Sequence, residues 1–202
     1  MIKIHPLFAV LSVVVLLNGE FALFSIYFVA LVLHELGHLA MAKVCGITVE
    51  RCTIYPYGGE LIIENEWMIP YEKRIILALG GPLASGCCLV FAELLMEPFA
   101  TPFYKMNFFL LCINLLPIWP LDGGRVLLYF SLAIYDEAKI YHLFITISMV
   151  LGSCFVLYAG MYLPAALPLF ILSLFLLLKV FNEWKVRKYR TAFEKNIHRR
   201  LT

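Results

Sequence analysis

The chain has 202 residues, of which 62% are hydrophobic and only 15% are charged. A soluble globular domain is typically about half apolar and about a quarter charged, so this composition excludes that class and indicates a membrane protein. The formal net charge of +2 says little about binding partners by itself.

Six apolar stretches are candidates for membrane-spanning helices, which need about 20 residues each. In chain order they cover residues 5–19, 21–44, 75–96, 105–132, 141–160 and 164–182. No clear small-x-small cleavage site follows the short first stretch, so we expect a retained span rather than a signal peptide. The sequence predicts an all-α polytopic membrane protein with one intramembrane domain, residues 1–184, followed by a tail, residues 185–202.

Basic residues are distributed unevenly along the chain. If the N-terminus lies inside, Lys105 is the one Lys or Arg of the sixteen at an outside boundary. The tail carries seven: Lys185, Arg187, Lys188, Arg190, Lys195, Arg199 and Arg200. The positive-inside rule therefore predicts a multi-pass protein with both termini in the cytoplasm. We interpret the basic tail as a helix end facing lipid headgroups, with no direct nucleic acid binding.

The longest connection between candidate spans, residues 46–73, follows the second span. It contains two runs of β-forming residues, 47–55 and 60–63, separated by Pro56, Tyr57, Gly58 and Gly59. This pattern predicts a small membrane-associated β-hairpin. It is either a simple surface hairpin or a strand edge beside a membrane cavity, where an extended peptide could pair with it.

The second span contains the motif HELGH, residues 34–38. His34 and His38 are four residues apart, so on a helix both imidazoles lie on one face and can reach a single ion. Glu35 lies beside the first histidine, where its carboxylate can take a proton from a zinc-bound water, as in the H-E-x-x-H motif of metal-dependent proteases. The motif also occurs by chance in polar helices, but charged groups inside a span are rare and usually mark function.

A second polar cluster lies in the fourth span, NLLPIWPLDGGR, residues 114–125. Two prolines and two glycines disfavour a continuous helix here, so we expect a broken fourth span. The cluster contains a carboxylate, Asp122, and a hydrolytic zinc site is expected to have three protein ligands plus water. Spans two and four run in the same direction, which places His34 about 20 Å and Asp122 about 25 Å from their starts, at a similar depth.

Four motifs in this order resemble the site-2 protease family of intramembrane zinc metalloproteases over nearly the whole chain: HELGH, YPYGGE, GGPLAS and NLLPIWPLDGGR. The last motif and the six-span layout are most similar to the sporulation branch, which releases a membrane-held pro-sigma factor. The resemblance implies zinc as cofactor, with His34, His38 and Asp122 as ligands and Glu35 as catalytic base. It further implies Asn114 as a substrate-contacting or oxyanion-supporting residue, a membrane-tethered protein as substrate, and inhibitory membrane proteins as partners.

In one respect the chain departs from that branch. Sporulation-branch members usually carry a nucleotide-sensing domain after the last span, whereas this sequence ends at Thr202 after the basic tail, so we expect that domain to be absent or removed. An alternative function is non-enzymatic, because a membrane metal carrier or sensor could use the same three ligands without Glu35. The intact H-E-x-x-H motif favours a zinc metalloendopeptidase. The paired glycines of GGPLAS predict close helix packing.

Overall fold

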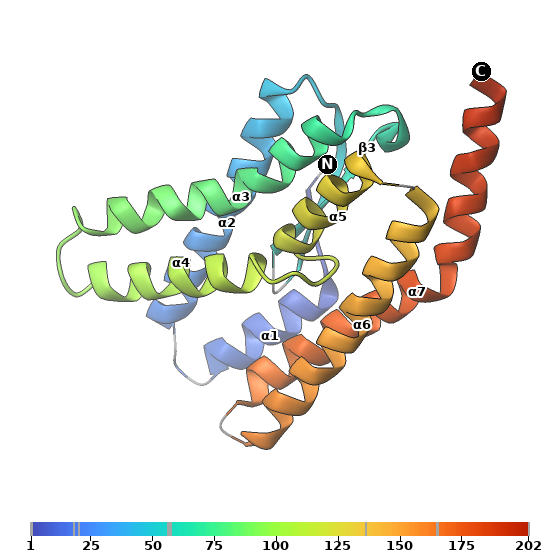
Figure 1. Ribbon diagram of the computed structural model, residues 1–202. Helices are drawn as coiled ribbons and strands as arrows, with labels where there is room; N and C mark the ends of the chain where they lie inside the picture. Colours follow the sequence, from blue (N-terminus) through green and yellow to red (C-terminus); the bar gives the residue numbers. More distant parts are fainter. Residues whose placement is uncertain are drawn as a thin grey trace.

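A computed structural model describes residues 2–17, 19, 21–55, 58–135, 137–164 and 166–201, and the side chains of the tail from residue 188 onward lie outside the described part. The protein is mostly helical, with one small sheet (Figure 1). The elements are β1 (Ile2–Ile4), α1 (Pro6–Leu17), α2 (Phe21–Val44), β2 (Val49–Tyr55), β3 (Gly58–Ile63), a 3-10 turn (Glu66–Met68), α3 (Tyr71–Ala92), α4 (Ala100–Asn114), α5 (Asp122–Ile134), α6 (Glu137–Met161) and α7 (Leu167–Leu201).

Four helices in the described part are long and apolar enough to cross a membrane: α2, α3, α6 and α7. Their surfaces expose large apolar side chains, including Leu83, Val90 and Leu157, as expected of an integral membrane protein in contact with lipid. The other helices, α1, α4 and α5, have 12, 15 and 13 residues and are each shorter than the roughly 20 residues that a single span needs. The membrane character is confirmed, and the count of six crossings stays a prediction.

Some observed helices begin or end at other residues than the predicted apolar stretches, because charged residues or prolines lie near those helix ends. Helix α2 covers the predicted residues 21–44, whereas α3 begins four residues before the predicted stretch. Its first turn is charged and therefore fails a hydropathy criterion, but Pro70 directly before it is well suited to a helix start. The predicted fourth stretch, 105–132, is occupied by α4 and α5 with residues 115–121 between them. Helix α7 runs on into the predicted tail and extends beyond the other helices (Figure 1).

The sheet has three strands in the order β1-β2-β3. Strands β2 and β3 pair antiparallel, with Cys52 opposite Leu61, which confirms the predicted hairpin; its turn residues Pro56 and Tyr57 lie outside the described residues. Strand β1 pairs parallel with β2 and was not predicted, because three residues before a helix carry no recognisable strand pattern. With β2 in the centre, β3 is an edge strand on the side of the sheet away from β1.

Helices α2 and α3 cross at two glycines. A Cβ atom added at Gly37 would lie 2.3 Å from the carbonyl oxygen of Gly80, and one at Gly80 would lie 2.6 Å from that of Gly37. The two backbones therefore touch, as small residues allow at helix crossings in membranes. This contact confirms the predicted close packing of the GGPLAS segment and brings α3 directly against the face of α2 that carries the histidines.

Candidate metal centre

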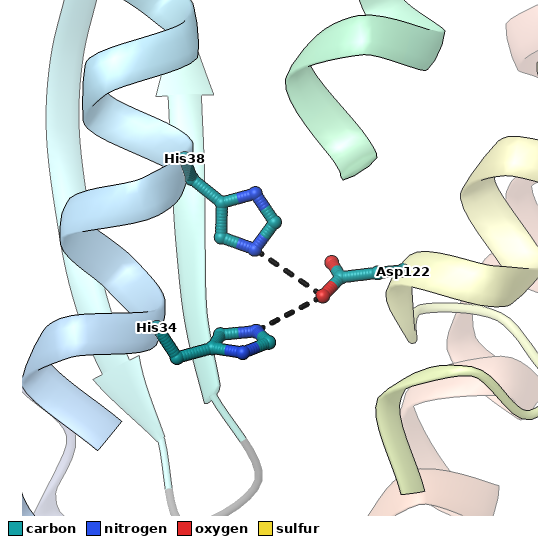
Figure 2. Close-up of side chains that lie close together, drawn as sticks. All are labelled: His34, His38 and Asp122. Carbon is teal, nitrogen blue, oxygen red and sulfur yellow. Dashed lines mark hydrogen bonds and ion pairs between the residues drawn. The ribbon is translucent and has the colours of Figure 1, made fainter. Parts of the chain in front are cut away.

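His34 and His38 project from α2 towards Asp122, the first residue of α5 (Figure 2). Asp122 Oδ2 lies 3.1 Å from His34 Nε2 and 3.2 Å from His38 Nε2. Ligand atoms around a tetrahedral zinc ion with bonds of about 2.1 Å are about 3.4 Å apart, so the triangle has the size of a zinc site. All three side chains are buried, and their ligand atoms lie within 4.8 Å of one another. Two imidazoles and one carboxylate are a donor set that fits zinc.

Each histidine is oriented by a hydrogen bond from its other ring nitrogen. His38 Nδ1 lies 2.8 Å from the carbonyl oxygen of Leu77 and therefore donates to it, which leaves the Nε2 lone pair directed at the site. His34 Nδ1 lies 2.9 Å from Ser85 Oγ, and Ser85 is completely buried. Such partners fix the ring orientation of metal-binding histidines. Both come from α3, and the sequence alone did not indicate their role.

Gly81 of α3 faces the two histidines. A Cβ atom added there would lie 2.3 Å from His38 Nε2 and 2.4 Å from His34 Nε2. Any side chain would therefore occupy the space in front of the two ligand nitrogens, and this space fits an ion rather than protein atoms. The two glycines of GGPLAS have separate roles, since Gly80 permits the helix crossing and Gly81 leaves room for the metal.

The side chain of Glu35 projects from α2 towards the edge strand β3. The backbone N–H of Gly59 donates a hydrogen bond to Glu35 Oε1, while Oε2 is buried with no hydrogen-bond partner. A Cβ atom at Gly59 would lie 2.0 Å from Oε2, so only glycine fits at this point of the strand. A buried carboxylate oxygen without a partner is costly in a purely structural role. Its free oxygen is suited to accept a proton.

Asn114 is the last residue of α4 and is also buried near Glu35. Its Nδ2 donates to the carbonyl oxygen of Leu110, at 3.1 Å. A Cβ atom added at Gly58 would lie 3.3 Å from Glu35 Oε1 and 3.7 Å from Asn114 Oδ1. The amide and the carboxylate therefore border the same point of the hairpin, and the role of Asn114 towards a substrate stays a prediction.

Residues 115–121 fold back onto the first turn of α5. A Cβ atom at Gly123 would lie 2.2 Å from the carbonyl oxygen of Leu115, and one at Gly124 would lie 2.5 Å from that of Ile118. The loop is anchored by Leu121, which is fully buried in an apolar cluster with residues of β2 and α7. The glycines after Asp122 permit this close return of the chain, and the apolar anchor fixes the carboxylate at the start of α5.

Comparison with known proteins finds relatives among metalloproteases. Residues 90–159 match peptidase family M50. Stage IV sporulation protein FB of Bacillus subtilis is 28% identical over 201 residues, which cover 93% of this chain and 67% of that protein. A zinc metalloprotease of Methanocaldococcus jannaschii is 32% identical over 62% of this chain and 41% of its own length. The solved structure of a site-2 protease from Methanocaldococcus jannaschii matches with a TM-score of 0.72 and 27% identity, covering 91% of this chain and 90% of the other.

The chain is similar to the site-2 protease family in both sequence and fold. The resemblance found in the four sequence motifs is thereby confirmed. A relative is a zinc metalloprotease, and in this chain the group of His34, His38 and Asp122 is positioned to hold a metal ion. This chain spans about two thirds of the sporulation protein and less than half of the archaeal relative.

Beside the candidate metal centre, the protein has a cavity of 480 Å³. It runs from His38 along β3 and is bounded by residues of α3, α5 and α7. Lys179 of α7 reaches across to β3, where Nζ lies 2.6 Å from Glu60 Oε2 and 3.1 Å from the hydroxyl oxygen of Tyr55. Burial by itself raises the pKa of the Glu60 carboxyl, but the hydrogen bond from Lys179 and its positive charge outweigh burial and hold the pKa below its ordinary value.

Proposed function

We propose that this chain is an intramembrane zinc metalloendopeptidase that hydrolyses a peptide bond in or near the transmembrane segment of a membrane-tethered protein. The observation that carries the proposal is the buried group of His34, His38 and Asp122, with an unpartnered carboxylate oxygen of Glu35 on the same helix. We further propose six membrane crossings, with the α4–α5 pair as a broken fourth span and both termini in the cytoplasm.

His34, His38 and Asp122 would hold the zinc ion. When bound, zinc supplies Lewis-acid chemistry, since it polarises a carbonyl group and lowers the pKa of a water molecule to about 7. Glu35 Oε2 accepts a proton from the attacking water as the water oxygen bonds to the scissile carbonyl carbon. It then returns the proton to the leaving amine nitrogen when the C–N bond breaks. The hydrogen bond from Gly59 N–H to Oε1 holds the carboxylate in place for both transfers.

Asn114 is proposed to contact the substrate. Its side-chain amide borders Glu35 at Gly58, and an amide N–H there can donate to the carbonyl oxygen on which negative charge develops. Its Nδ2 also donates to the carbonyl oxygen of Leu110, which orients the amide.

The substrate must be unwound before cleavage, because a helix hides its peptide bonds in internal hydrogen bonds. Strand β3 provides a place for the unwound segment, since it is the edge of the sheet and lines the cavity next to His38. An extended peptide adding to this edge would recover its backbone hydrogen bonds. The likeness to the sporulation branch supports a membrane-held pro-sigma factor as substrate and inhibitory membrane proteins as regulators.

The decisive experiment measures metal content and cleavage together. Detergent-purified wild type should contain one zinc per chain, which His34→Ala and Asp122→Ala should lose. Glu35→Gln should keep zinc and lose about 10²–10⁴ in turnover of a membrane-tethered reporter, the range for general acid–base catalysis. Zinc retained in Asp122→Ala refutes the ligand set. Full function of Glu35→Gln would favour a metal carrier or sensor over a protease.

A further inference from the structure

Arg125 lines the cavity beside the metal centre, and its Nε is buried with no hydrogen-bond partner. It lies three residues after Asp122, in the first turn of α5. Its guanidinium carbon lies 5.6 Å from the centroid of the Trp119 ring, which also borders the cavity. A cation–π contact of this kind holds the group over an aromatic face but leaves its N–H donors unused.

The other two cations among the described lining residues are engaged. Lys179 is paired with Glu60 and also donates to the Tyr55 hydroxyl. Arg74 donates from Nε to the carbonyl oxygen of Ile69, at 2.9 Å, and from Nη2 to that of Glu66. Among the Lys and Arg side chains described in the cavity lining, Arg125 is therefore the one without a hydrogen-bonded partner.

The carboxylates of the lining are engaged as well. Glu66 Oε1 accepts a hydrogen bond from the Tyr129 hydroxyl at 3.1 Å, and Glu183 accepts one from the Tyr141 hydroxyl. Asp122, Glu60 and Glu66 are near enough to act on the charge of Arg125, but none of them forms an ion pair with it. Glu60 is compensated by Lys179, so a positive charge remains at Arg125 without a direct partner.

We propose that Arg125 is a specificity-determining residue that binds the carboxylate of an acidic side chain in the substrate; this inference rests on the proposed protease function. A buried charge is costly unless it is paired, and a guanidinium fork matches a carboxylate with two parallel hydrogen bonds. A neutral carbonyl oxygen could accept one of these bonds but would leave the charge uncompensated. The cavity therefore favours substrates with Asp or Glu over the amide counterparts.

The position of the acidic residue follows from the spacing of Asp122 and Arg125. One helical turn places their backbones about 5 Å apart along α5, and an arginine side chain extends that reach. An extended peptide advances about 3.3 Å per residue. The preferred acidic residue thus lies within about three residues of the cleaved bond, on the part of the peptide that runs beside β3.

The test measures binding without cleavage, in full-length, zinc-loaded protein carrying Glu35→Gln in lipid nanodiscs. The probes are fluorescent synthetic peptides with one Leu- and Ala-rich span and a central Asn-Gly pair that breaks the helix. One Asp is placed in turn at each of three positions on either side of the centre, and each peptide is compared with its Asn counterpart. At one position or more, Asp should bind about tenfold more tightly than Asn.

Variants of Arg125 decide the assignment. Arg125→Met should abolish the Asp preference while leaving affinity for the Asn peptides unchanged. Arg125→Lys keeps the charge but loses the forked pair of N–H donors, so it should retain part of the Asp preference. This variant replaces Arg125→Met in the test if the Met variant folds poorly. Lys185→Met is the matched control, because Lys185 lies over Phe181 and outside the cavity lining; it should keep the full preference.

An Asp-to-Asn affinity ratio near one at every position, or a ratio unchanged in Arg125→Met, overturns the inference. Cleavage of the same peptides by the protein with Glu35 intact is a separate measure of the proposed function. Cleavage without any Asp preference refutes the role of Arg125 and leaves the proposed protease function intact. Absence of cleavage with the Asp preference present counts against the proposed function and supports the role of Arg125 in binding.

Discussion

Replacing Gly81 by alanine tests whether the space in front of the two histidines is a metal site. The added Cβ would lie 2.3 Å from His38 Nε2 and 2.4 Å from His34 Nε2, whereas ordinary contacts to a Cβ are 3.4 Å or more. The two imidazole rings cannot move away by about 1 Å and still keep the hydrogen bonds of His34 to Ser85 and of His38 to Leu77. Loss of such orienting bonds alone costs 10–100-fold in metal affinity, so we expect Gly81→Ala to weaken zinc binding at least about 100-fold, or about 2.8 kcal/mol.

The assay is titration of metal-free protein with zinc against a competing chelator, followed by the metal content of the purified protein. The matched control is Gly86→Ala on the same helix, because a Cβ at Gly86 meets nothing within 4 Å. It should bind zinc as the wild type does, and both substitutions favour the helix by up to about 1 kcal/mol. Wild-type zinc affinity in Gly81→Ala would refute the assignment of this space to the metal, and equal loss in both variants would point to general damage of α3.

Three further predictions separate the metal, the base and the substrate strand. Ser85→Ala removes the hydrogen-bond partner of His34 Nδ1 and should lower zinc affinity 10–100-fold, measured by the same titration; unchanged affinity would show that Ser85 does not orient the ring. Gly59→Ala should displace the Glu35 carboxylate, since the new Cβ would lie 2.0 Å from Oε2, and should reduce reporter cleavage with zinc still bound; loss of zinc instead would mean that the hairpin supports the metal ligands. Proline placed singly at residues 60–63 removes one backbone donor of β3 each time. Where that donor faces the free edge, cleavage should slow while zinc content stays at one per chain; cleavage unchanged at all four positions contradicts strand addition.

The sequence predicted those parts of the site that depend on local spacing. The histidines four residues apart lie on one face of α2, as helical geometry requires, and the matching depths of His34 and Asp122 anticipated their contact at 3.1 Å. The hairpin followed from its β-forming runs and intervening glycines. These features are encoded within short segments, so a pattern in the sequence suffices to predict them.

The partners contributed by other elements could not be predicted in this way. Ser85 and the Leu77 carbonyl reach the histidines only because α3 crosses α2 at Gly37 and Gly80, and the crossing geometry is not a property of either sequence segment alone. The motif GGPLAS indicated close packing but not which glycine faces the metal. The cavity and its unpaired Arg125 arise where β3, α3, α5 and α7 meet, and no local pattern describes that junction.

The interruption between α4 and α5 explains how one short segment supplies two different groups to the site. In a continuous helix Asn114 and Asp122 would be about 12 Å apart along the axis, so they could not both border the same part of α2. The loop of residues 115–121 instead returns to the first turn of α5, where Gly123 and Gly124 allow contact with the carbonyl groups of Leu115 and Ile118. Asn114 then faces Glu35 across Gly58, while Asp122 meets His34, directly before Glu35, and His38, three residues after it. A break that is costly in an apolar span is thus compensated by burial, and it brings the carboxylate and the amide to neighbouring positions beside α2.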